Sequence, residues 1–74
     1  MIQETLASNL NRLRVGKSLS KCELARMAGI NRKAIIYIEQ GSYNPTLYML
    51  EDIATALHVS IIDLLKEGES NDPN

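Results

Sequence analysis

The stretch that most constrains this chain runs from Ser20 to Gly41 and reads SKCELARMAGINRKAIIYIEQG. Ser20 is followed three residues later by Glu23, the capping-box pattern in which each side chain satisfies a backbone N–H of the first helical turn. Gly29 suits the left-handed conformation that ends a helix, and Asn31 is a good N-cap for the next helix. The stretch therefore predicts two short helices joined by a tight turn, with the second helix ending at Gly41.

The second of these helices separates two kinds of side chain. Because residues turn about 100° apiece in a helix, Ala34, Ile35 and Ile38 share a face that suits a core. The opposite arc of roughly 140° carries Arg32, Lys33, Ile36, Tyr37 and Gln40. Such a face is often only a solvated surface. However, a basic, long-armed first turn held by a glycine turn against a smaller helix is the geometry that places a recognition helix in the DNA major groove.

These residues resemble the phage-repressor, Cro-type (lambda-repressor-like, XRE) helix-turn-helix family, whose pattern is Ser-Gln-x-x-Leu-Ala-x-x-x-Gly-Val-Ser-x-x-x-Ile-x-x-Ile-Glu-x-Gly. The chain matches it at Ser20, Leu24, Ala25, Gly29, Ile30, Asn31, Ile35, Ile38, Glu39 and Gly41, and then at Asn44, Pro45, Leu50, Ile53, Ala54, Leu57, Val59 and Leu64. The family often has glutamine where this chain has Lys21, and both side chains can donate to a phosphate. The resemblance covers roughly residues 6–66 and implies an all-α, five-helix DNA-binding domain over residues 1–67.

The net charge of −1 is unfavourable for DNA binding, but the charge is unevenly distributed. Residues 1–44 contain seven lysines and arginines against three glutamates, whereas residues 45–74 contain one lysine against six acidic residues. The local face within a Debye length of about 10 Å governs attraction to phosphate more than the total charge does. The N-terminal half is therefore suited to DNA, with weak non-specific affinity and reliance on specific contacts.

The segments before and after the helix-turn-helix follow from hydrophobic spacing. Apolar side chains at helical spacing predict a first helix over about residues 2–14. Gly16 is expected to permit the chain reversal that follows it. Residues 41–45 are expected to form a loop, because Pro45 keeps the residue before it extended.

Capping residues predict two more helices. Thr46 is expected to cap a helix over residues 47–57, and Ser60 with Asp63 forms a second capping box. The fifth helix is expected to run to about residue 66. Residues 68–74 have no apolar anchor and are expected to be disordered.

The resemblance also implies which residues contact DNA. Base readout is expected from Arg32, Lys33, Ile36 and Tyr37. Arginine and lysine suit the guanine O6/N7 acceptor pair and isoleucine can pack on a thymine methyl, so the half-site should contain a G with a T nearby. Backbone contacts are expected from Ser20, Lys21, Asn31, Gln40, Tyr43, Asn44 and Arg14. For the two loop residues, a packed ring and a simple turn residue are the alternatives.

A structural ion pair is implied by the same resemblance. In the family, the residues that match Arg14 and Glu39 pair with each other at the end of the recognition helix. The pair is expected to be partly buried. Its expected role is to orient the helix more than to stabilise the fold, because buried pairs often barely repay their desolvation.

Self-association is expected because a chain of 74 residues is near the lower limit for an independent core. A C2 dimer through the fifth helix and the region before it is predicted, with an interface containing Tyr48, Ile62 and Leu65. Such a dimer would place two recognition helices about 34 Å apart, one turn of DNA, on a palindromic operator.

Other chemistries find little support. His58, the only histidine, lies at a helix junction, where a surface cap is the simpler interpretation. The single cysteine, Cys22, excludes an internal disulfide and suits a reducing cytosol, with a redox-sensing role as the weaker alternative. No metal site, cofactor, small-molecule ligand, membrane span or signal peptide is expected, and the protein is predicted to be cytoplasmic and not an enzyme.

The sequence thus predicts a sequence-specific DNA-binding transcriptional regulator, a repressor that binds double-stranded DNA as a homodimer. One alternative keeps the fold: an antitoxin that binds its own promoter and a toxin protein. The other is a protein-interaction module that works through the acidic surface of the last two helices. A co-purifying partner would indicate the first alternative, and salt-insensitive or absent DNA binding the second.

Overall fold

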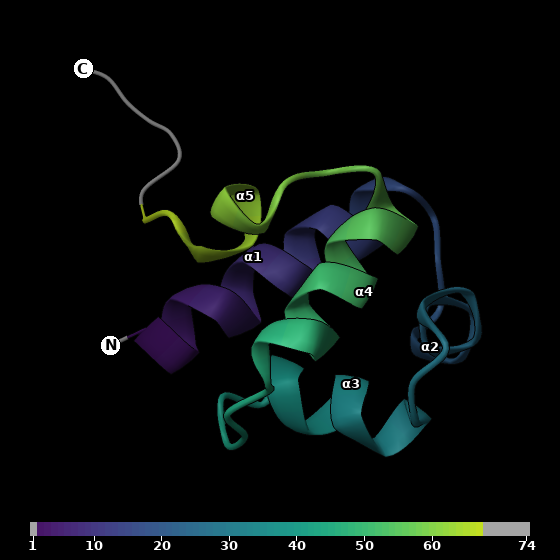
Figure 1. The fold of residues 1–74 in the computed structure, drawn as a ribbon, viewed down its shortest axis with the longest axis horizontal. Helices are drawn as coiled ribbons and strands as arrows, with labels where there is room; N and C mark the ends of the chain where they lie inside the picture. Colours follow the sequence, from purple (N-terminus) through teal and green to yellow (C-terminus); the bar gives the residue numbers. More distant parts are fainter. Residues whose placement is uncertain (1, 68–74) are drawn as a thin grey trace.

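The computed structural model describes residues 2–67 and confirms the all-α architecture (Figure 1). Its five helices are α1 (Ile2–Gly16), α2 (Lys21–Ala28), α3 (Arg32–Glu39), α4 (Leu47–Leu57) and α5 (Ile61–Leu65). α1 packs against α3 and α5, α4 packs against α2 and α5, and α2 packs against α3. The tail that was expected to be disordered, residues 68–74, lies outside the described residues.

The predicted capping residues start the helices. The hydroxyl oxygen of Ser20 accepts the backbone N–H of Glu23 at 2.9 Å, and the backbone N–H of Ser20 donates to the Glu23 carboxylate at 2.8 Å. Ser60 and Asp63 repeat this capping box at the start of α5, and Thr46 caps α4 through its hydroxyl oxygen. Local side-chain chemistry therefore sets the starts of α2, α4 and α5, as the sequence predicts.

Residues in the left-handed backbone conformation follow three of the helices. Gly29 after α2 and Gly41 after α3 have φ angles of 72° and 74°, as their positions in the sequence predict. His58 caps the C-terminus of α4 with φ 59° and is exposed. The cap expected of this histidine is therefore confirmed.

The end of α1 differs from the prediction. The helix continues two residues further than expected, and Gly16 is its last residue instead of the site of reversal. The reversal occurs at Ser18, whose φ is 58°. The Arg14 carbonyl accepts the backbone N–H of Lys17 at 3.1 Å and that of Leu19 at 3.2 Å, which closes the helix end. The left-handed residue is therefore needed only at position 18, after these carbonyls are satisfied.

One hydrophobic core lies between the five helices. Its buried apolar residues are Leu6, Leu10, Leu24, Ala25, Ile35, Ile38, Leu50, Ile53, Ala54, Ala56, Leu57 and Leu64. The buried residues of α3 belong to the face that the sequence assigns to the core. Because this face is fixed inside the protein, the opposite face of α3 points outward.

Candidate nucleic-acid interface

The outward face of α3 carries the side chains predicted to read DNA bases. Arg32 and Lys33 are exposed, Tyr37 is 45% exposed, and Ile36 is half-buried. Within residues 2–67, neither cationic side chain forms a hydrogen bond or an ion pair. α3 therefore presents uncommitted long side chains in its first turn, as insertion into a DNA groove requires.

The start of α3 is fixed by its own cap. Asn31 has an extended backbone, and its side-chain oxygen accepts the backbone N–H of Lys33 at 2.7 Å. Asn31 is exposed beside the basic first turn. The free N–H groups and the dipole at this helix end add partial positive charge to that of the side chains.

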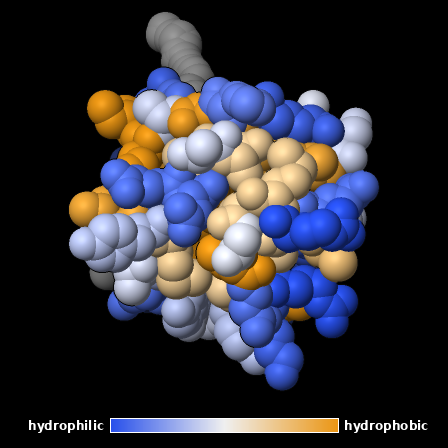
Figure 2. All heavy atoms as spheres, turned by 45° about the vertical axis from the view of Figure 1, so that its right-hand side comes forward, coloured by the Kyte–Doolittle hydropathy of each residue, from blue (hydrophilic) through white to orange (hydrophobic). Residues whose placement is uncertain are grey.

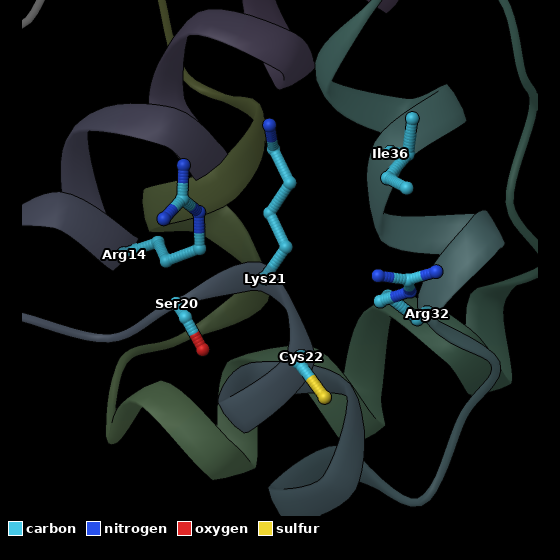
Figure 3. Close-up of a pocket in the computed structure, with 6 residues that line it drawn as sticks. All are labelled: Arg14, Ser20, Lys21, Cys22, Arg32 and Ile36. Carbon is cyan, nitrogen blue, oxygen red and sulfur yellow. The ribbon is translucent and has the colours of Figure 1, made fainter.

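A groove separates the start of α2 from α3 (Figure 3). Its lining residues are Arg14, Ser20, Lys21, Cys22, Arg32 and Ile36. In Figure 3, Lys21 extends between Arg14 and Ile36, and Arg32 lies at the α3 side. The Ser20 hydroxyl accepts the capping bond and keeps its proton for donation. The cations of Lys21 and Arg32, together with the Ser20 hydroxyl, lie around one open groove and suit a phosphate group.

Hydrophilic side chains dominate the surface on the α2 side of the molecule. Figure 2 shows this side, where they surround a smaller, mildly hydrophobic area. Within α2, Lys21, Arg26 and Met27 are exposed. The surface beside the groove is therefore mostly polar, which suits a hydrated nucleic-acid interface.

An ion pair connects α1 with the last residue of α3. Arg14 Nε donates to Glu39 Oε2 at 2.7 Å, and Arg14 Nη2 donates to Glu39 Oε1 at 3.0 Å. The Glu39 side chain is only 6% exposed. Arg14 Nη1 also donates to the Leu19 carbonyl at 2.7 Å, so the same guanidinium holds the turn before α2. The pair implied by the family resemblance is therefore present, whereas a phosphate contact by Arg14 stays a prediction.

The carboxyl group of this pair stays ionised. Burial raises the pKa of Glu39, but hydrogen bonds from Arg14 and Asn11, together with the charges of Arg14 and Lys21, outweigh burial and lower the pKa below its ordinary value. The hydrogen bonds that Arg14 donates to Glu39 in turn raise the pKa of Arg14. The orientation of α3 relative to α1 is therefore held by a charged, bidentate contact.

The loop after α3 shows a mixed arrangement. Gln40 and Asn44 are exposed, whereas the ring of Tyr43 is half-buried and packs against the core. The Tyr43 hydroxyl donates to the sulfur of Met49 at 3.7 Å. Packing thus accounts for the Tyr43 ring, and the contacts of these three residues with a DNA backbone stay predictions.

The residues predicted to form a dimer interface lie at α4 and α5. Tyr48 is 77% exposed and Ile62 is 69% exposed, while Leu65 is half-buried. Leu65 lines a small apolar cleft with Ile2, Gln3, Leu6, Asn44, Pro45 and Leu50. The apolar surface of α5 and the groove beside α3 therefore lie on different elements.

Two polar residues of α1 take part in contacts that sequence reasoning missed. Asn11 donates to Glu39 Oε1 at 3.1 Å. Asn9 is buried and contacts the end of α5. A signal for Asn9 exists in the sequence, because it lies three residues after Leu6 and four before Leu13, on the apolar face of α1.

Comparison with known proteins decides the family. The helix-turn-helix family model HTH_3 matches residues 10–64. The chain belongs to this family. Among solved structures, the hypothetical transcription factor NHTF from Neisseria superposes on this HTH_3 protein with a TM-score of 0.85 at 35% identity, over 89% of this chain and 76% of that chain.

Two further proteins extend the comparison. The restriction-modification controller protein C.AhdI from Aeromonas hydrophila matches with a TM-score of 0.82 at 30% identity, over 85% of this HTH_3 chain and 96% of that chain. The immunity repressor protein of Bacillus phage phi105 is 30% identical over 63 residues, which are 85% of this chain and 44% of that protein. The HTH_3 chain is thus a helix-turn-helix transcription regulator.

Residues 2–67 contain no group of three or more histidine, cysteine, aspartate or glutamate side chains placed to hold a metal ion. In the same region, none of the helices combines the length and apolar character needed to span a membrane.

Proposed function

We propose that this protein is a sequence-specific repressor that binds a palindromic operator as a homodimer. The outward face of α3 carries the proposal, because Arg32 and Lys33 are exposed there and have no partner within residues 2–67. The buried face of the same helix keeps these side chains in a fixed direction. The similarity to a phage immunity repressor supports the direction of regulation.

The proposed contacts divide into two classes. Arg32, Lys33, Ile36 and Tyr37 read base edges in the major groove, with the cations on guanine and the isoleucine on a thymine methyl. The groove between α2 and α3 receives a backbone phosphate. The remaining backbone contacts come from Asn31, Gln40, Tyr43 and Asn44, which set the register but carry no sequence information.

The proposed dimer uses the exposed apolar side chains of α4 and α5. Tyr48 and Ile62 expose large apolar side chains, and Leu65 lies at the adjoining cleft. A second copy that covers this surface would remove it from water and pair two recognition helices at a spacing of about 34 Å. As a repressor, the protein would act in the cytoplasm by binding alone, without catalysis or a cofactor.

Selection of bound sequences from random DNA, followed by footprinting, tests the proposal. The expected result is a palindrome whose half-sites contain a G with a T nearby and whose centres lie about one helical turn apart. Recovery of unrelated sequences, or of a single asymmetric half-site protected by one monomer, would contradict it.

A further inference from the structure

Asn9 is a buried polar side chain in the middle of α1, with its residue only 7% exposed. Its Nδ2 group donates to the backbone carbonyl of Leu64 at 2.9 Å and to that of Lys66 at 2.8 Å. Its side-chain oxygen accepts from Arg12 Nη2 at 3.4 Å. Both amide protons of Asn9 are thus used to hold the end of α5, 55 and 57 residues away in the sequence.

α5 depends on such external contacts because it has only five residues. A helix of this length does not form alone in water. Its start is closed by the Ser60–Asp63 capping box, and Leu64 anchors it in the core with no exposed surface. Its last carbonyls have no partner within the helix, and Asn9 satisfies that of Leu64 together with that of the C-cap residue Lys66.

The outer side chains of α5 are those assigned above to the dimer. Ile62 is exposed two residues before the segment that Asn9 holds, and in the sequence Leu65 lies between the two residues whose carbonyls Asn9 binds. The direction of both side chains therefore depends on how the end of α5 sits on α1. The contact is polar and directional, so it selects one position of α5 more strictly than the packing of Leu64 alone.

We propose that Asn9 is a positioning residue for dimerisation. Its hydrogen bonds hold α5 against α1, so that Ile62 and Leu65 are placed to contact a second copy of the chain. This inference rests on the proposed dimer. Without these hydrogen bonds, only a fraction of molecules holds α5 in the position that dimerisation requires. Because both protomers must be in that position, the apparent dimer dissociation constant rises as the inverse square of that fraction. The groove beside α3 does not include Asn9 and is not affected.

The chain offers a matched control two residues away on the same helix. Asn11 makes the same kind of side-chain donation, but to Glu39 at the end of α3. Two residues turn about 200° around a helix, so the two amides serve opposite sides of α1. Asn9→Asp and Asn11→Asp are the same isosteric change. The first turns two attractive contacts of α5 into repulsive ones, and the second places a carboxylate against Glu39.

The experiment measures dimerisation and DNA binding separately. Sedimentation equilibrium gives the dimer dissociation constant, and fluorescence anisotropy gives the affinity of monomers for a duplex that carries one selected half-site. Asn9→Asp should raise the dimer dissociation constant by about tenfold or more, the effect of losing two hydrogen bonds, with half-site affinity unchanged within about twofold. Asn11→Asp should instead lower the half-site affinity and leave the dimer dissociation constant unchanged. Circular dichroism checks that each variant folds.

A second variant covers the case in which Asn9→Asp does not fold. Asn9→Ala removes the two bonds without adding charge, and it should also weaken dimerisation while sparing half-site binding. Amide exchange at Lys66, whose N–H donates to the Ile62 carbonyl at 2.8 Å, should then accelerate while the amides of α3 stay protected. Equal losses of dimerisation and half-site binding in Asn9→Ala, or no change in dimerisation, would overturn the inference. A wild-type protein that stays monomeric would instead refute the proposed dimer.

Discussion

Arg14 on α1 clamps Glu39 at the end of α3 through two hydrogen bonds of 2.7 and 3.0 Å. The same guanidinium binds the Leu19 carbonyl, and Asn11 supports the carboxylate from the same helix. α3 is therefore fixed at its C-terminal end by charge and at its inner face by packing. This arrangement leaves its basic first turn free to contact DNA.

Replacement of Glu39 by glutamine tests the importance of the clamp. Glu39→Gln keeps the size of the side chain but leaves the Arg14 charge largely buried without a counter-charge. We expect the free energy of unfolding to fall by roughly 3 kcal/mol, measured by urea denaturation. Glu51→Gln, at an exposed carboxylate of α4, is the control. It should change the free energy of unfolding by less than about 0.5 kcal/mol. Equal stabilities of the two variants would show that the pair is energetically neutral.

The clamp also predicts how stability depends on pH. Because the pKa of Glu39 is lower in the folded protein, folding is favoured by its ionisation, and this contribution is complete above the ordinary glutamate pKa of about 4.3. It should disappear as the pH falls through the lowered pKa. The backbone N–H groups of Ser20 and Ser60 similarly lower the pKa of Glu23 and of Asp63. Urea titrations between about pH 7 and pH 3 should therefore show a plateau and then a decline.

The same titrations on Glu39→Gln separate the contribution of Glu39 to the pH dependence of stability from those of Glu23 and Asp63. The decline should become shallower but should not vanish, because the two capping carboxylates remain. A decline identical to that of the wild type would assign the acid sensitivity to residues other than Glu39.

Two classes of DNA contact should respond differently to mutation. Arg32→Ala should weaken binding to the selected operator by about 1–3 kcal/mol and relax specificity at one base pair. Lys21→Ala should weaken specific and non-specific duplexes alike and reduce the slope of log K against log salt by about one. Gel-shift titrations at several salt concentrations measure both effects. Unchanged operator affinity in both variants would remove α3 and the start of α2 from the interface.

The sequence predicts the positions of the helices well because local chemistry specifies them. Ser20 with Glu23 begins α2, and Gly29 and Gly41 end α2 and α3, so each boundary depends on residues close in the chain. The outward direction of Arg32 also follows, because helical spacing places it opposite the core residues.

The contacts between distant residues could not be predicted in the same way. The spacing of Asn9 places it on the apolar face of α1, but no local pattern shows that it binds carbonyls more than fifty residues away. Asn11 likewise meets Glu39 only after α1 packs on α3. The Arg14–Glu39 pair was expected through the family resemblance and not from spacing. Reversal at Ser18 was missed because glycine is the usual left-handed residue.

Substitution of Ile62 tests the proposed dimer surface. Ile62 is 69% exposed in the monomer, so Ile62→Glu should leave folding almost unchanged. In a dimer, the same change buries an unpaired charge, which is costly, and it should convert the protein to a monomer at micromolar concentration. Sedimentation velocity measures this change. Ser8→Glu, an equally charged substitution at an exposed position of α1, is the control and should remain dimeric. If Ile62→Glu also remains dimeric, the interface lies elsewhere, and a different surface must bring the two α3 helices together on DNA.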